Sequence, residues 1–378
     1  MAAVSRTIAR PAAKVVRMDL GLLVIVLALL VLGLVMVYSA SYGFALMEGG
    51  IYEGQPTYFL KRQARFALLG FGALLILSRI DYHLYRRYAL WILGGTVALL
   101  APMALGLGRW LVNSQSVQPS EIAKLGAMTY IAVWLAAKGE NLRSLNLGLI
   151  PFAVLLGVIA GLIMLQPNFS TGMLLVAAAT AMFFVAGADI KQLLIGFVFG
   201  GLALFLVAIA MSYRVDRINL WLQSPFSDTS GKGFQVVQCL AALHRGGWAG
   251  VGLGQSQQKF IIYAAHTDGI FAILGEEMGL LGCLLVIGLY GLWTWRGLRV
   301  AWAAPDMYGR LLAVGLVGWV TLQAILHIGV NTASTPFTGT VLPFISYGGS
   351  SLLSSLASVG ILLNISRHSS VEDSEHSP

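Results

Sequence analysis

Charged residues are scarce in this chain of 378 residues: 11% are Asp, Glu, Lys or Arg, whereas 57% are hydrophobic. A soluble domain carries about 25% charged residues, which help to cover its surface. The scarcity therefore excludes a large water-soluble domain. Cysteine is rarer still, with Cys239 in a predicted loop and Cys283 inside a predicted helix. Two such thiols exclude a disulfide framework, and their spacing matches no metal site.

The chain has long apolar runs instead. A run of about 18 or more apolar residues is typical of a membrane-spanning helix. Backbone groups in lipid must be satisfied internally, and continuous rather than alternating hydrophobicity favours helices over a barrel. The sequence therefore predicts an all-α polytopic membrane protein with about ten transmembrane helices. We expect them at residues 20–40, 63–79, 88–107, 120–136, 148–165, 170–187, 190–212, 269–294, 308–330 and 341–365.

The distribution of positive charge predicts the topology. Most of the 24 Lys and Arg residues fall in segments that are cytoplasmic if the N-terminus is inside. We therefore expect both termini in the cytoplasm and the chain in the cytoplasmic membrane. The net charge of +8 is then a topology signal, and no nucleic-acid-binding module is expected. The predicted divisions are a basic tail at 1–18, a transmembrane domain at 19–366 with a long extracytoplasmic loop at 213–268, and a polar tail at 367–378.

The loop 213–268 is the main candidate for chemistry, because a connection of this length is usually functional when it is not a linker. It is rich in glycine and lacks the composition of a disordered segment, so we expect short amphipathic helices and glycine turns. Its alternative role is a structural cap over the bundle. Its candidate polar residues are Arg214, Arg217, Ser256, Gln258, Lys259, His266 and Thr267.

Asp268 lies where this loop meets the next predicted helix. Partial burial would raise the pKa of a carboxyl group there and suit it to act as a general base. The alternative is an N-cap, for which Asp is also preferred. Glu276 and Glu277 lie roughly 12 Å deeper along the helix, too far for a paired-carboxylate glycosidase site. We expect these two to pair with cations or hydroxyls inside the bundle.

Two further groups of polar residues are candidates. Glu121 and Lys124 are spaced to form an ion pair within one helical turn, which serves either packing or ligand contact. Arg109, in the preceding outer loop, is suited to bidentate phosphate binding, although such an arginine also meets lipid headgroups. Ser346 lies in a stretch of paired glycines and serines that favours close helix packing or a break in a helix.

Four motifs together resemble one family. They are QPSEIAK at 118–124, GLGQSQQK at 252–259, HTD at 266–268 with GEE at 275–277, and LPFISYGGSS at 342–351. Their order and topology are similar to those of the SEDS proteins (shape, elongation, division and sporulation), over about residues 19–368. Segments 36–41, 59–63 and 364–368 resemble the division branch, FtsW, more than the elongation branch, RodA. The chain departs from the family pattern at Asn168, Ala264 and His327.

The resemblance implies a ten-helix peptidoglycan glycosyltransferase that polymerises lipid II outside the membrane. It also implies a class B penicillin-binding transpeptidase and divisome membrane proteins as partners, with a growing glycan strand as product. Asp268 is then the expected catalytic base. The residues expected to bind substrate or support the reaction are Arg109, Glu121, Lys124, Arg214, Arg217, Ser256, Gln258, Lys259, His266, Thr267, Glu276, Glu277 and Ser346.

The chemistry requires one base and a cation. An acceptor hydroxyl attacks an anomeric carbon that carries a lipid pyrophosphate, so a positive group must stabilise the departing charge. Arg109, Arg214, Arg217 and Lys259 are candidates, as is a divalent cation, Mg²⁺ or Mn²⁺, with Asp268 as its candidate ligand. Three other functions stay open at this stage: an elongation-type (RodA) polymerase, a lipid II flippase or transporter, and a non-catalytic divisome scaffold.

Overall fold

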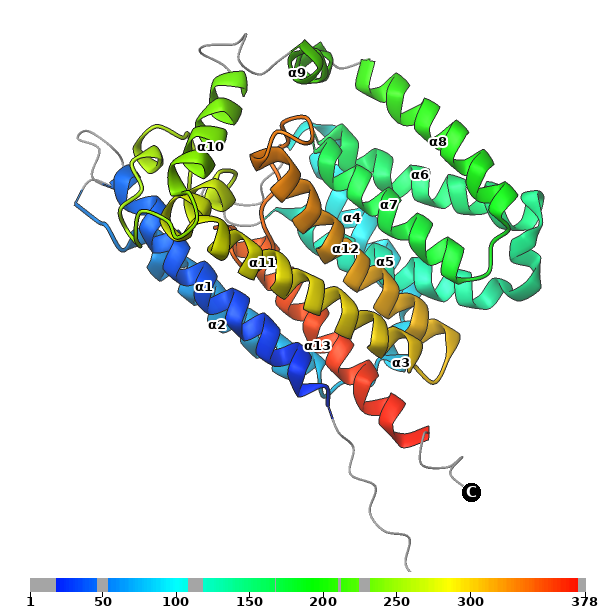
Figure 1. The fold of residues 1–378 in the computed structure, drawn as a ribbon. Helices are drawn as coiled ribbons and strands as arrows, with labels where there is room; N and C mark the ends of the chain where they lie inside the picture. Colours follow the sequence, from blue (N-terminus) through cyan, green and yellow to red (C-terminus); the bar gives the residue numbers. More distant parts are fainter. Residues whose placement is uncertain are drawn as a thin grey trace, which may run out of the picture.

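The computed structural model describes residues 18–45, 54–107, 118–166, 168–209, 212–223 and 232–372 (Figure 1). Every regular element in these ranges is a helix, which confirms the all-α prediction. Within the same ranges six helices are long and apolar enough to cross a membrane, so the chain is a multi-pass membrane protein. They cover residues 20–44, 145–165, 190–207, 270–302, 307–331 and 349–368.

The helices form a bundle with three parts (Figure 1). Two helices run side by side along one edge, three lie in the middle, and five form the other side. The pair along the edge is α1 (Leu20–Ala45) and α2 (Tyr58–Leu77). The middle helices are α11 (Ile270–Trp302), α12 (Met307–Asn331) and α13 (Gly349–Glu372). The helices of the other side are α4 (Ala89–Pro102), α5 (Pro119–Lys138), α6 (Ile150–Leu165), α7 (Phe169–Val185) and α8 (Ile190–Ile209).

The two ends of the bundle differ. The first turn of α1 and the last turn of α13 lie at one end, whereas α9 (Ser212–Gln223) and α10 (Lys232–Gly246) lie at the other (Figure 1). The sequence therefore folds into the expected short helices within the loop 213–268. The remaining short elements are α3 (His83–Arg87), η1 (Met103–Leu107), η2 (Gly139–Arg143), η3 (Leu145–Leu149) and η5 (Gln258–Phe260).

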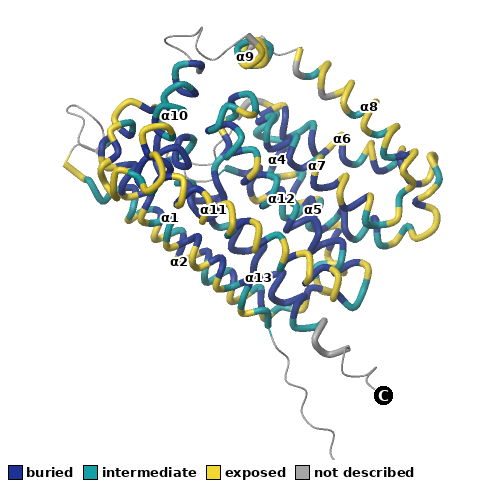
Figure 2. Tube along the Cα trace, in the orientation of Figure 1, coloured by how far each residue is buried: buried dark blue, intermediate teal, exposed yellow. Residues whose placement is uncertain are grey.

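Small residues let α2 and α13 approach closely. A side chain added at Gly70 would collide with Leu356, and one added at Gly360 would begin 2.6 Å from the carbonyl of Leu74. Such contacts between small residues are typical of helix pairs in membranes. Figure 2 shows the resulting contrast: α13 is buried along most of its length, whereas α8 is largely exposed.

The last helix begins at Gly349, eight residues after the predicted start at 341. Phe344 adopts a left-handed φ of +67°, and Pro343 precedes it. The N–H of Leu342 donates to the hydroxyl of Ser346 at 2.8 Å instead of joining a helix. The stretch 342–348 is therefore a compact turn, as the alternative of a broken helix anticipated. At α2 the error is in the opposite direction, because this helix begins at Tyr58, five residues before the predicted start at 63.

A glycine interrupts α11. Gly279 has φ +67° and ψ −166°, which breaks the hydrogen-bond ladder of the helix. The loop after α10 supplies replacement partners, because the N–H groups of Leu280 and Leu281 donate to the carbonyls of Gly247 and Trp248 at 2.9 and 3.2 Å. This loop therefore lies alongside α11 about one turn on either side of the break.

Candidate active site

Asp268 lies at the end of the bundle that carries α9 and α10, immediately before α11, and is half-buried. The N-cap position of α11 is occupied by Gly269. Asp268 therefore stands one residue before the N-cap position. An acidic side chain is thus held at the entrance of α11.

Three successive carbonyls of the HTD motif are held by donors from distant segments. The carbonyl of His266 accepts from the N–H of Tyr347 at 2.9 Å, and that of Thr267 accepts from the hydroxyl of Ser346 at 2.8 Å. The carbonyl of Asp268 accepts from the side-chain amide of Asn331 at 2.9 Å. The turn 342–348 and the end of α12 therefore fix the backbone on which Asp268 stands.

The surroundings of the Asp268 carboxylate differ on two sides. A side chain at Gly339 would begin 3.4 Å from Oδ2 of Asp268, and Gly339 itself is exposed. On another side lies Cys239 of α10, where burial and the charge of Asp268 together raise the pKa of the thiol to about 12. The carboxylate therefore lies beside the exposed Gly339 and near a thiol that is protonated at pH 7.

His266 sits in an aromatic cage rather than beside a partner charge. Its ring centroid lies 4.5 Å from that of Phe59, 5.4 Å from Tyr347 and 5.8 Å from Phe44. Burial lowers the pKa of His266 to about 4, so the imidazole is neutral at pH 7. This arrangement favours a packing role that joins α1, α2 and the turn 342–348.

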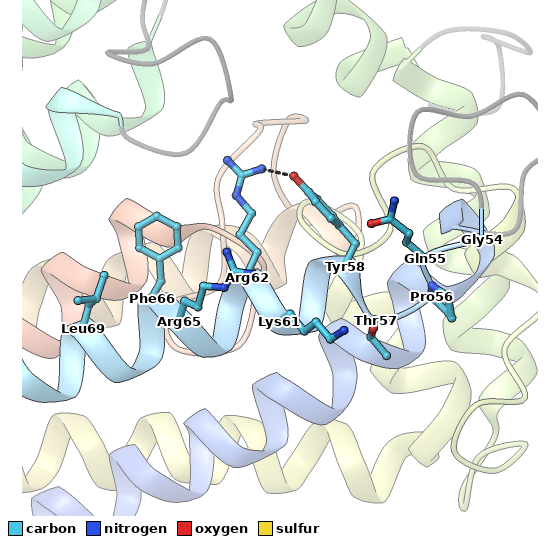
Figure 3. Close-up of a pocket in the computed structure, with 10 residues that line it drawn as sticks. All are labelled: Gly54, Gln55, Pro56, Thr57, Tyr58, Lys61, Arg62, Arg65, Phe66 and Leu69. Carbon is cyan, nitrogen blue, oxygen red and sulfur yellow. Dashed lines mark hydrogen bonds between the residues drawn. The ribbon is translucent and has the colours of Figure 1, made fainter.

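A cavity of about 800 Å³ opens beside the first half of α2 (Figure 3). Three cations line it, Lys61, Arg62 and Arg65, and two apolar side chains, Phe66 and Leu69, continue it along the helix. Lys61 and Arg65 are exposed and one helical turn apart. The three cations suit an anionic headgroup, and the apolar side chains beside them suit a lipid tail.

The turn 342–348 contacts both the helix that lines this cavity, α2, and the HTD motif. Gln63, which is buried, donates to the carbonyl of Ser346 at 3.1 Å and accepts from the N–H of Gly348 at 3.2 Å. The same turn holds the HTD carbonyls on its other side. The neighbouring Phe59 packs on His266. The sequence analysis missed this use of the α2 cations, although their spacing of three and four residues was a usable signal.

The carboxylates of the GEE motif anchor the loop after α10, as their predicted pairing with hydroxyls and cations implied. Glu276 accepts from the hydroxyl of Ser256 and from the N–H groups of Gln257 and Gln258, the latter two at 3.1 and 3.2 Å. Arg245 lies 3.7 Å away. The side chain of Glu276 is fully buried, and its hydrogen bonds hold this loop against α11.

Glu277 and Lys259 form a second buried contact in the same region. Their charged atoms lie 3.8 Å apart, Ser39 of α1 donates to Glu277, and the Lys259 ammonium also donates to the carbonyl of Gly254 at 2.6 Å. Lys259 and Ser256 are both buried. We expected Lys259 as a candidate partner of a phosphate, but the structure places its charge against Glu277 instead.

Glu121 and Lys124 form the predicted ion pair within α5, with Nζ 2.9 Å from Oε1. Lys124 is fully buried and also donates to Gln323 of α12 at 3.0 Å. The pair therefore joins the start of α5 to α12. Asn168, where the family pattern has a carboxylate, donates to the hydroxyl of Ser120 at 2.9 Å and accepts from that of Thr171 at 2.8 Å.

The remaining predicted cations are placed as follows. Arg217 of α9 donates to the carbonyl of Phe337 at 3.3 Å, close to the segment that carries Gly339. Arg109 and the side chain of Arg214 lie outside the described residues. Of the other two departures, Ala264 adopts a left-handed φ of +56°, and His327 contacts the carbonyl of Thr340 through Nδ1 at 2.7 Å.

The described residues do not assemble a protein-only metal centre. In the ranges that the structure covers, no group of three or more His, Cys, Asp or Glu side chains is placed to hold a metal ion. Structural and catalytic metals are generally held by such groups. Within these ranges Asp268 therefore belongs to no such group.

Comparison with known proteins identifies the family. The sequence profile of the FtsW, RodA and SpoVE cell cycle proteins matches residues 20–371. The chain belongs to this family. Its relatives include the stage V sporulation protein E of Bacillus subtilis, 40% identical over 93% of this chain and 97% of that protein. A probable peptidoglycan glycosyltransferase FtsW of Thioalkalivibrio sulfidiphilus is 41% identical over 93% of this chain and 90% of that protein.

Solved structures of the family share the fold. A peptidoglycan synthase complex that coordinates polymerisation and crosslinking contains a chain with a TM-score of 0.75 and 27% identity, covering 93% of this chain and 98% of that one. The rod shape determining protein RodA of Thermus thermophilus gives a TM-score of 0.65 at 25% identity, with 93% and 97% covered. The family assignment made from the four motifs is thus confirmed.

Proposed function

We propose that this member of the FtsW, RodA and SpoVE family is a peptidoglycan glycosyltransferase that polymerises lipid II during cell division. The observation that carries the proposal is that one turn, 342–348, holds both the backbone beside Asp268 and the helix α2 that carries the cationic cavity. Relatives at 38–41% identity that are named probable peptidoglycan glycosyltransferase FtsW support the division branch over the elongation branch.

The proposed membrane arrangement has ten passages. In it, α2, α4, α5 and α7 cross the membrane together with the six long apolar helices. The chain then starts and finishes on the same side, the cytoplasm by its positive charge, with α9, α10 and Asp268 outside. A lipid-linked sugar anchored in the outer leaflet would reach Asp268 from the cavity of α2.

The proposed reaction uses one base and a cationic site. The acceptor sugar hydroxyl attacks the anomeric carbon of the donor, and Asp268 takes the hydroxyl proton. The bond from that carbon to the pyrophosphate oxygen breaks, and the lipid pyrophosphate leaves with the electron pair. Lys61, Arg62 and Arg65 stabilise the charge that collects on it. Attack from the face opposite the leaving group inverts the anomeric centre.

The partners follow from the family. A class B penicillin-binding transpeptidase would crosslink the growing glycan strand, consistent with the solved complex that combines polymerisation and crosslinking. Other membrane proteins of the divisome would localise the pair.

Polymerisation of labelled lipid II by the purified protein with its transpeptidase tests the proposal. We expect Asp268→Asn to lower the rate by at least about 10²-fold, the lower end of what a general base contributes. Asp81→Asn, at the opposite end of the bundle, is the matched control and should retain activity. Replacing Arg65 by Glu should raise the KM for lipid II. Near-normal polymer from folded Asp268→Asn would refute the base assignment, and an inactive wild type would favour a scaffold or a flippase.

A further inference from the structure

Asn331 makes three hydrogen bonds at the junction between Asp268 and α11. Its Nδ2 donates to the carbonyl of Asp268 and to that of His327, each at 2.9 Å. Its Oδ1 accepts from the N–H of Ala272 at 3.3 Å. The side chain is fully buried at the last position of α12. No motif in the sequence singled this amide out for a role near the base.

The geometry matters because the first N–H groups of a helix have no partner within that helix. Ala272 lies in the first turn of α11, and Asn331 supplies an acceptor for its N–H from another helix. The other atom of the same amide holds the carbonyl of Asp268, just before the helix. One side chain therefore bridges the backbone carbonyl of Asp268 and the first turn of the helix that follows it.

We propose that Asn331 is a positioning residue for Asp268. The side-chain amide of Asn331 holds the entrance of α11 against the end of α12 and so sets the direction of the Asp268 carboxylate. The inference rests on the proposed function, in which Asp268 is the base. Asn331 touches the backbone of Asp268 rather than a reacting atom. Its contribution should therefore appear in turnover and leave substrate binding in the α2 cavity unchanged.

The chain offers a matched control at the opposite end of the bundle. Asn364 of α13 is also buried, and its amide makes the same kind of bridge: Oδ1 accepts from the N–H of Tyr82 at 2.9 Å, and Nδ2 donates to the carbonyl of Ser78 at 3.1 Å. Replacing either asparagine by aspartate keeps the shape and the acceptor and removes the donor. The two changes are therefore comparable in their effect on packing.

The experiment compares Asn331→Asp with Asn364→Asp in the lipid II polymerisation assay, with rates expressed per folded molecule. We expect Asn331→Asp to lower kcat by roughly 10- to 100-fold, because a displacement of about 1 Å has effects of that order. The KM for lipid II should stay within about twofold, since no contact with the α2 cavity is lost. Asn364→Asp should keep wild-type kcat.

A second variant keeps the test decisive if Asn331→Asp does not fold. Asn331→Ser has a side chain too short to bridge both groups and should show the same loss of kcat. Hydrogen exchange should also increase in residues 264–273 of either Asn331 variant, but not in the Asn364 variant. Equal kcat in the Asn331 and Asn364 variants would overturn the proposal, whereas an inactive wild type would instead contradict the proposed function.

Discussion

Removing the buried cation of α5 should destabilise the protein sharply. Lys124 is fully buried, and its ammonium donates to Oε1 of Glu121 at 2.9 Å and to Oε1 of Gln323 at 3.0 Å. It also lies 4.3 Å from the ring centroid of Trp319. Lys124→Met fills much of the same volume but leaves the carboxylate of Glu121 buried without its partner charge.

The magnitude follows from burial. Removing one partner of a buried ion pair costs about 3–5 kcal/mol, because the remaining charge is neither solvated nor paired. At roughly 2 °C per kcal/mol for a large domain, the melting temperature should fall by about 6–10 °C. The double variant Glu121→Gln with Lys124→Met removes both charges and should recover most of the loss, since replacing a whole buried pair is often close to neutral.

Thermal melting in detergent is the assay, with Lys138→Met as the matched control on the same helix. Lys138 is half-buried at the end of α5, where its ammonium lies 4.9 Å from the Trp134 ring. Its removal should cost no more than about 1 kcal/mol, the usual range for exposed charges. If Lys124→Met and Lys138→Met melt at the same temperature, or if the double variant is less stable than Lys124→Met, the reasoning fails.

Two further predictions concern pH and topology. Burial holds the pKa of His266 near 4, below the ordinary 6.5, so the unfolded chain binds more protons between these values. Stability should therefore decline as pH falls from about 6.5 to 4, by up to roughly 3 kcal/mol, and melting of His266→Phe should lack this component. A cysteine replacing the exposed Gln255 should react with an impermeant thiol reagent in intact cells. Reaction only after permeabilisation would contradict the outer location. A cysteine at the nearby position 256 would not test the topology in this way, because Ser256 is buried.

The helices were largely predictable because apolar length is a local property. The predicted helix at 308–330 and the observed α12 differ by one residue at each end. The error at α13 has a nonlocal cause, since the turn 342–348 is held open by Gln63 of α2 and by the HTD carbonyls. A contact with a segment nearly 300 residues away leaves no signal in a hydropathy pattern.

The residues of the site also differ in whether their place follows from a local or a nonlocal signal. Asp268 and the Glu121–Lys124 pair were predictable, because position at a helix entrance and spacing within a turn can be read from neighbouring residues. Asn331 was not, because its importance comes from the meeting of α12 with the start of α11. The sequence predicts Lys259 as a candidate cation for the departing pyrophosphate, because its partner, Glu277, approaches only when the loop folds against α11.

The serines of α13 bear on the rival function of a transporter, which would need polar groups that continue across the membrane. Ser351, Ser354, Ser355 and Ser358 are all buried along this helix. The hydroxyls of Ser354 and Ser358 donate to carbonyls three residues earlier in α13, at 3.1 and 2.7 Å. The hydroxyls of Ser351 and Ser355 have no hydrogen-bond partner among the described residues. Two of the four hydroxyls are therefore satisfied within their own helix, and the small side chains let α13 pack closely, as the contact of Gly360 with α2 also indicates. Asp268 and the cations of α2, by contrast, lie at one end of the bundle, as a polymerase working at one membrane face requires.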